Sequence, residues 1–426
     1  MILGTAQVDI TPEPGVELSG FAARTQPSTG LLDRLYAKAL YLEQDGARVL
    51  WIHCDLIGFD TSIVKSFRDW ARENLGLAEE QVMLSATHTH AGPCTIHLCE
   101  AGEFDPAYIE SLHLRLREVA GQAMGHLEPA SLVVAEGRLD LAVDRRKAAS
   151  AHTDPRVLAV GFRRGDGTFA AATINYAVHP VALGPSNRLI SGDISGQAAI
   201  SLARQLPGSP VVLMTNGASA NLNPPAENVA FSKVMEWGGM IANSIAERLR
   251  EQEPVPDVPL QTVRRIVPLP LDVYDANRIN ATADKALKNP APLAEWGDKY
   301  RRAVERWRSN LLGSLKNADN GSHREAELFA LGLGNLVLLG INAEVFSEFT
   351  DWLRRSTSDR ICLVSYANGD MGYLPTRAAY AEGGYEVEIA HFFYGGFRPQ
   401  AGGLELLARE AGDLLLQLRK QDLCRK

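Results

Sequence analysis

Short apolar runs that alternate with helix-like stretches constrain the fold of this chain more than any other feature of its sequence. Runs of strand length lie at residues 48–54, 82–86, 211–214, 336–340 and 361–365. Stretches with helical spacing lie at residues 61–75, 105–126, 194–206 and 229–253. Strands that alternate with helices form parallel sheets, whereas the Asp-Gly turn within residues 163–167 is typical of an antiparallel hairpin. The sequence therefore predicts an α/β fold with a mixed β-sheet core and flanking helices.

The remaining stretches extend this pattern towards both ends of the chain. Short strands joined by turns are predicted within residues 1–60 and 130–178, and a polar helical region within residues 276–331. An amphipathic helix is predicted from about residue 404 to residue 419. The proline-rich stretch 253–259 is the clearest break, but it is too short to establish a domain boundary. The length of 426 residues allows one large domain or two closely packed ones.

Composition excludes several classes of function. With 46% hydrophobic and 22% charged residues, the chain has the composition of an ordinary globular protein. A formal net charge of −8 argues against nucleic acid or an anionic membrane surface as the main partner. No stretch predicts a transmembrane segment, and the N-terminus lacks the pattern of a signal peptide. Five sparse cysteines, an odd number, favour a reducing compartment, so we expect a cytoplasmic location.

A pair of histidines follows one of the apolar runs. His88 and His90 come after the run 82–86 and precede a Gly-Pro turn. In an extended segment the side chains alternate between faces, so these two imidazoles are expected to point the same way. Such a pair suits metal binding, with one imidazole left for proton transfer. The alternative is a pair of hydrogen-bonded histidines in a polar turn.

Other candidate side chains also lie at strand ends or in glycine-rich loops. His179 ends the apolar run 174–178, and Glu344 follows the run 336–340. Tyr373 and Tyr385 lie in a glycine-rich region. Each has an ordinary structural explanation when it is taken alone. Ser219 follows an apolar strand, but it lacks the flanking glycines of a nucleophile elbow.

Taken in order, these segments resemble the catalytic domain of the neutral/alkaline non-lysosomal ceramidases. The matching segments are Ser85–Pro93, Asp144–Arg146, His179 with Arg188–Asp193, Asn216–Pro224, Glu344, and Tyr373 with Tyr385. The resemblance implies one zinc ion per chain, with four protein ligands. These ligands would be His88, His179, Glu344 and Tyr373. Two imidazoles, a carboxylate and a phenol oxygen are all acceptable to zinc, and they leave a position open for exchange.

The resemblance also implies the roles of three further residues. His90 would take or return a proton while an amide bond of an N-acyl substrate is cleaved. Tyr385 and Arg145 would stabilise the developing oxyanion, although the sequence leaves the choice between Arg145 and Arg146 open. A second metal ion near Asp55, at another strand end, is a weaker hypothesis.

Two departures from the family bear on the substrate. Residues 1–426 would form a single zinc-hydrolase domain without the immunoglobulin-like C-terminal domain of the ceramidases. The family's loop serine aligns with Gly217, which displaces Ser219. We therefore expect a small-molecule substrate that is smaller or more polar than ceramide. The alternatives are a zinc-dependent esterase or lactonase, and a non-catalytic metal-stabilised binding protein.

Overall fold

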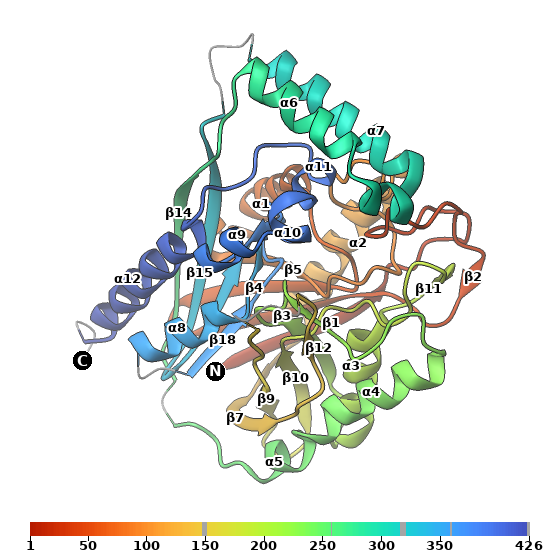
Figure 1. Cartoon of the computed structure of the whole chain (residues 1–426). Helices are drawn as coiled ribbons and strands as arrows, with labels where there is room; N and C mark the ends of the chain where they lie inside the picture. The colour runs from red at the N-terminus through yellow and green to blue at the C-terminus, as the bar shows by residue number, and fades with distance from the viewer. Residues whose placement is uncertain (147–150, 257, 316–320, 358–359, 424–426) are drawn as a thin grey trace.

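Three large β-sheets, with helices around them, form the framework of the chain in the computed structural model (Figure 1). It describes residues 1–146, 151–256, 258–315, 321–357 and 360–423. Each large sheet combines antiparallel pairs with a parallel pair. The predicted α/β fold with a mixed β-sheet core is therefore confirmed.

The first sheet has the strand order β5-β4-β3-β1-β6. Its strands are β1 (Ile2–Asp9), β3 (Tyr36–Gln44), β4 (Ala47–Cys54), β5 (Val82–Ala86) and β6 (Leu127–Pro129). Helices α1 (Thr61–Leu75) and α2 (Pro106–Gly125) pack against it through a shared apolar cluster. Both helices begin where the sequence predicts, because the carboxylates of Asp60 and Asp105 accept hydrogen bonds from backbone N–H groups of the first turn.

The second sheet has the order β12-β10-β9-β7. Its strands are β7 (Ser131–Arg138), β9 (Arg156–Arg163), β10 (Phe169–Tyr176) and β12 (Val211–Asn216). The predicted hairpin joins β9 to β10, and β10 runs parallel to β12. Helices α3 (Asp193–Gln205), α4 (Phe231–Asn243) and α5 (Ala246–Glu251) pack with it in a second apolar cluster. The single helix predicted for residues 229–253 is thus divided in two.

The third sheet has the order β14-β15-β16-β18. Its strands are β14 (Leu260–Pro270), β15 (His323–Leu333), β16 (Leu336–Ile341) and β18 (Arg360–Val364), and helices α8 (Glu348–Ser356) and α12 (Gly403–Leu423) pack with it. The predicted helical region 276–331 is therefore wrong at its end. The charges of Glu325 and Glu327 made the start of β15 look like a helix surface, but β15 pairs with β14 and β16 along both edges.

The three sheets share one central core. An apolar cluster combines Trp51 and Met83 of the first sheet with Phe162 of the second and Phe329 and Leu338 of the third. Burial of this surface brings together strand ends that are far apart in the sequence. The remaining short elements are β2 (Gly30–Leu31), η1 (Glu79–Gln81), β8 (Val143–Asp144), β11 (Leu189–Ile190), β13 (Leu222–Asn223), β17 (Glu344–Val345), β19 (Tyr373–Leu374), α9 (Arg377–Glu382), α10 (Tyr385–Glu388) and α11 (Ala390–Phe393).

A helical hairpin of α6 (Ala276–Leu287) and α7 (Pro290–Ser314) projects beside α11 (Figure 1). Its apolar residues form a separate cluster with the segment 389–397. Among the described residues, no helix is both long and apolar enough to cross a bilayer.

Candidate metal centre and active-site cavity

The candidate site residues come from loops that follow strands of all three sheets. His88 lies two residues beyond β5, and His179 lies three residues beyond β10. Glu344 begins β17, where it pairs in parallel register with Tyr373 of β19. The structure therefore brings together four side chains that span 286 positions of the sequence, from residue 88 to residue 373.

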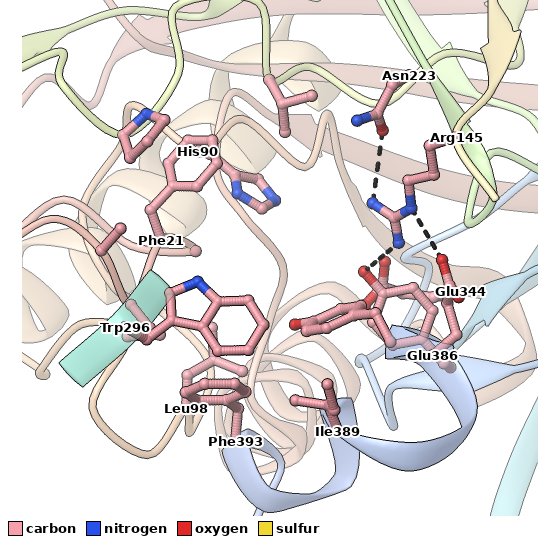
Figure 2. A pocket seen from close by; sticks show the side chains of 18 of the residues that line it. Phe21, His90, Leu98, Arg145, Asn223, Trp296, Glu344, Glu386, Ile389 and Phe393 are labelled. Atoms are coloured by element: carbon pink, nitrogen blue, oxygen red, sulfur yellow. Dashed lines mark hydrogen bonds and ion pairs between the residues drawn. The ribbon is translucent and has the colours of Figure 1, made fainter. Parts of the chain in front are cut away.

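A cavity of about 530 Å³ opens beside these strand ends (Figure 2). Six of the seven predicted site residues line it: His88, His90, Arg145, Glu344, Tyr373 and Tyr385. The seventh, His179, lies behind them against the other two histidines. One wall is polar and the other apolar, and the apolar wall consists of Phe21, Leu98, Trp296, Ile389 and Phe393.

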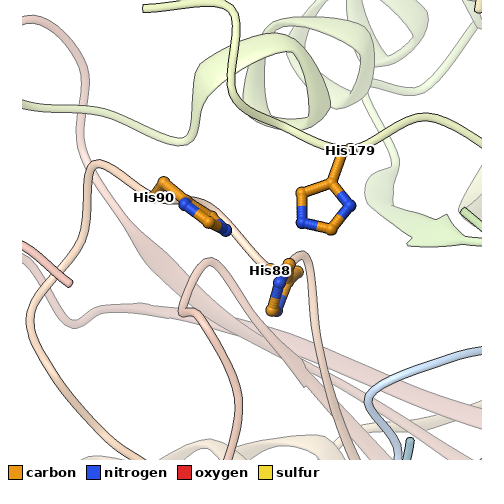
Figure 3. Close-up of side chains that lie close together, drawn as sticks. All are labelled: His88, His90 and His179. Atoms are coloured by element: carbon orange, nitrogen blue, oxygen red, sulfur yellow. The ribbon is translucent and has the colours of Figure 1, made fainter. Parts of the chain in front are cut away.

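The three histidines converge (Figure 3). The ring centroid of His88 lies 5.0 Å from that of His90 and 4.7 Å from that of His179. One nitrogen of each ring lies within 4.8 Å of those of the other two. The predicted proximity of His88 and His90 is correct, but its predicted cause is wrong. The backbone of His88 is left-handed, with φ of 67°, so strand alternation does not orient the pair.

Two of these imidazoles are fixed in the manner of metal ligands. The Nδ1 atom of His88 lies 2.6 Å from the carbonyl oxygen of Ile57, and that of His179 lies 3.3 Å from the carbonyl oxygen of Ser219. Such contacts hold the proton on Nδ1 and leave Nε2 as the electron-pair donor. Both Nε2 atoms face Glu344 Oε2, at 3.5 Å from His88 and 3.7 Å from His179. The donor set and its outer contacts fit a zinc ion.

Burial also favours the neutral imidazoles that bind metals. It lowers the pKa of His90 and His179 well below the usual value, and the neighbouring His88 adds to this effect. Burial acts on His88 in the same direction, but Glu344 and Asp370 outweigh it and raise the pKa of His88. The negative charges of Glu344 and Asp370 therefore act on His88 more than on the other two imidazoles.

Glu344 is held by tyrosines that the sequence analysis missed. Tyr394 donates a hydrogen bond of 2.6 Å to Glu344 Oε1, and Tyr366 donates one of 3.4 Å to Oε2. The Tyr366 ring also stacks on His88, with centroids 3.8 Å apart. These contacts fix both a carboxylate and an imidazole of the candidate centre.

Asp370 is a further acidic residue at the site. Together with His88 and Glu344 it forms a second group whose ligand atoms lie within 4.8 Å of one another. Burial and then the charge of Glu344 raise the pKa of Asp370 to about 7. Its position in the glycine-rich stretch shortly before Tyr373 was the only sequence signal that could have identified it.

Arg145 links the metal side of the cavity to its polar wall. Its Nη2 donates a 3.1 Å hydrogen bond to the Tyr373 hydroxyl, and its Nε donates one of 2.9 Å to Glu386. The guanidinium carbon also lies 5.7 Å from the ring centroid of Tyr385. The guanidinium of Arg146 instead donates to the carbonyl of Gly383 and to Glu386. Contact with Tyr373 thus distinguishes Arg145 from Arg146.

Tyr373 and Tyr385 meet edge to face, with ring centroids 5.7 Å apart. Burial raises the pKa of both phenols, and Glu344 raises that of Tyr373 further. Both phenols are therefore protonated hydrogen-bond donors at neutral pH when no metal is bound.

Two weaker candidates lie outside this arrangement. The Oδ2 atom of Asp55 accepts from the backbone of Tyr36 and pairs with Lys38 at 3.5 Å, so Asp55 belongs to neither group of candidate ligands among the described residues. Ser219 is fully buried, and His179 contacts its carbonyl oxygen rather than its hydroxyl. Neither observation supports a second metal ion at Asp55 or a serine nucleophile.

Comparison with known proteins shows the same family that the sequence motifs resemble. A family model for the N-terminal part of neutral/alkaline non-lysosomal ceramidases matches residues 1–213. The neutral ceramidase of Pseudomonas aeruginosa is 26% identical in an alignment of 219 residues that covers 46% of this chain and 32% of that protein. The neutral ceramidase of Mycobacterium tuberculosis is 27% identical in an alignment of 235 residues that covers 49% of this chain and 36% of that protein. The matched region therefore spans about a third of these relatives.

The fold agrees over a longer range than the sequence. The crystal structure of the Pseudomonas aeruginosa neutral ceramidase aligns with a TM-score of 0.77 at 19% identity. The alignment covers 99% of this chain and 74% of that one. The similarity in fold thus includes the third sheet and the helical hairpin, which lie beyond the region matched by the family model.

Proposed function

Because the chain belongs to the neutral/alkaline non-lysosomal ceramidase family, we propose that it is a zinc-dependent hydrolase of the amide bond in an N-acyl compound. One observation carries this proposal. Two imidazoles turn their Nε2 atoms towards one carboxylate oxygen at the edge of a cavity that has a polar and an apolar wall. We propose that residues 1–426 act as a single catalytic domain. The cytoplasmic location remains a prediction from the sequence.

In this proposal His88, His179, Glu344 and Tyr373 hold one zinc ion. Tyr373 is included because its backbone pairs with that of Glu344 where β17 and β19 lie side by side. A zinc ion held there supplies a Lewis acid beside the substrate carbonyl. The hydroxyl proton of Tyr373 would have to leave on binding, and the adjacent Arg145 guanidinium favours the resulting phenolate.

His90 would move the proton. Its two ring nitrogens have no hydrogen-bond partner among the described residues, and its ring lies 5.0 Å from that of His88. A ring nitrogen of its neutral imidazole is therefore available to accept a proton from the attacking water. The same proton would pass to the nitrogen of the leaving amine as the C–N bond breaks.

Arg145 and Tyr385 would act on the carbonyl oxygen. Both line the cavity, and hydrogen bonds to Glu386 and Asn223 hold the guanidinium in place. Donors that are already oriented stabilise negative charge on the oxygen without further reorganisation. Their neighbour Tyr373 connects this polar wall to the proposed ligands.

The substrate class is proposed from the cavity together with the family. The apolar wall suits an acyl chain, and the polar wall suits the amide and its amine portion.

A substrate screen with metal control tests the proposal. Purified protein is assayed on N-acyl compounds that vary in chain length and head group, with a matched ester for each amide. Metal content is measured in parallel. We expect about one zinc per chain, amide turnover that a chelator abolishes, and recovery when zinc is restored. Full activity of metal-free protein would refute the zinc mechanism, and turnover of esters alone would favour the esterase alternative.

A further inference from the structure

One tryptophan of the helical hairpin forms part of the cavity wall. Trp296 lines the cavity and lies immediately before Gly297, at a kink inside α7. The backbone of Gly297 has φ of 55° and ψ of −131°, a conformation that a residue with a Cβ rarely adopts. The kink divides α7 and places the indole among the rings of the cavity wall.

Aromatic contacts hold the indole in this position. Its ring centroid lies 5.8 Å from that of Tyr385 and 5.6 Å from that of Phe393, both in edge-to-face geometry. It also lies 5.9 Å from the centroid of Tyr300, one turn further along α7. Trp296 therefore contacts a proposed catalytic tyrosine and the apolar wall at the same time.

The part of α7 beyond the kink is firmly anchored. Trp307 is completely buried, and its indole nitrogen donates a 3.0 Å hydrogen bond to the carbonyl of Gly396. Tyr300 is also buried and packs against Phe392 and Phe393 of α11. Trp296 contacts this anchored half of α7 through the ring of Tyr300.

The two walls of the cavity differ in the part of an amide that each would accept. Figure 2 shows Trp296, Leu98 and Phe393 across the cavity from Arg145 and Asn223. An amide whose carbonyl oxygen lay beside Arg145 and Tyr385 would have the apolar wall, including the indole, available for one of its two substituents. The polar contacts of Arg145 with Glu386 and Asn223 make the opposite side unsuitable for an alkyl chain.

We infer that Trp296 is a specificity-determining residue that ends an acyl-chain subsite and so limits the length of the acyl chain. The other walls of this subsite are Phe21, Leu98, Ile389 and Phe393. The inference rests on the proposed amide hydrolysis. Each methylene buried in the subsite raises kcat/KM by about fourfold until the chain reaches the indole, after which further methylenes bring no gain.

Variants of Trp296 test this length limit. For Trp296→Ala we expect the preferred acyl chain to lengthen by about four carbons, with kcat/KM for the shorter chains reduced about tenfold. Trp296→Phe should shift the preference less, and it provides a second variant if the alanine substitution impairs folding. Trp70→Ala is the matched control, because Trp70 is also partly buried but packs on the first sheet's cluster. This control should keep the wild-type preference.

The assay varies the acyl chain and the alkyl chain of the amine separately. An unchanged acyl preference in both Trp296 variants would overturn the inference, as would a shift confined to the amine portion. Calorimetric titration of the zinc-loaded protein with free fatty acids of the same lengths needs no turnover. A length optimum that shifts in Trp296→Ala without any amide hydrolysis would support the subsite and refute the proposed function. Amide hydrolysis with an unchanged acyl-chain preference in the Trp296 variants would support the proposed function and refute the subsite.

Discussion

At the scale of single residues, the candidate centre depends on how its imidazoles are held. Backbone carbonyls of Ile57 and Ser219 contact the Nδ1 atoms of His88 and His179. His90 has no such contact, because neither of its ring nitrogens has a hydrogen-bond partner among the described residues. Two imidazoles thus have the orientation that the proposed zinc ligands need, and the third has ring nitrogens available for the proposed proton transfer.

Substitution of the three histidines should separate these roles. His88→Ala and His179→Ala should each lose both the zinc and the turnover, because each removes a ligand. His90→Ala should retain the zinc but lose about 10²–10⁴ in kcat, the range for removal of a general base. Zinc content and kcat measured on the same preparations check both statements. Loss of zinc from His90→Ala would mean that His90 is a ligand.

At the scale of elements, a buried ion pair joins the first sheet's helix to the third sheet. Arg68 of α1 donates to both carboxylate oxygens of Glu327 on β15, at 2.6 and 2.9 Å. Arg264 of β14 and Asn368 also contact this carboxylate. Glu327 is only 6% exposed, so its charge is compensated by these partners rather than by water.

Removal of this carboxylate charge should destabilise the protein strongly. Glu327→Gln leaves the buried guanidinium of Arg68 without its counter-ion, and we expect a loss of about 3 kcal/mol in the free energy of unfolding. Glu118→Gln is the control, since Glu118 forms an exposed pair with Arg115 and should change stability by less than about 1 kcal/mol. Urea denaturation measures both. Equal effects of the two substitutions would contradict a structural role for the buried pair.

At the scale of the whole molecule, burial keeps two histidines outside the cavity uncharged. His53 lies in β4, with hydrogen bonds to Ser85 and to the carbonyl of Met214. His391 lies in α11 beside Trp307. Burial, followed by the charge of Lys38, lowers the pKa of His53 to about 3. Burial, followed by the charge of Arg398, lowers the pKa of His391 to about 3.

These two groups predict loss of stability in acid. Their folded pKa values lie below the unfolded value of 6.5, so the unfolded chain binds protons first as the pH falls. The free energy of unfolding should therefore decrease between about pH 6.5 and pH 3, by up to about 5 kcal/mol for each group. His391→Phe should reduce the slope by about one proton in denaturation measured across this range. An unchanged slope would show that His391 does not contribute.

Local signals explain which parts of the fold could be predicted from the sequence. Helix α1 covers the predicted range because Asp60 caps its first turn and Gly76 ends it in the left-handed conformation. The strands β5 and β16 are continuous apolar runs. The family resemblance likewise depended on short motifs such as His88-x-His90, in which the informative residues are neighbours in the chain.

Tertiary structure decided what the sequence left open. Residues 323–331 form a strand because β14 and β16 provide pairing partners on both sides, which no local pattern shows. The proposal of Arg145 rather than Arg146 is supported by a hydrogen bond to Tyr373, 228 positions away. Tyr394 and Trp296 line the cavity, and Asp370 lies beside His88 and Glu344, because the fold places the strand ends and the helical hairpin around one cavity. Sequence determines local conformation and carries motifs, whereas burial of the shared core determines which distant side chains meet.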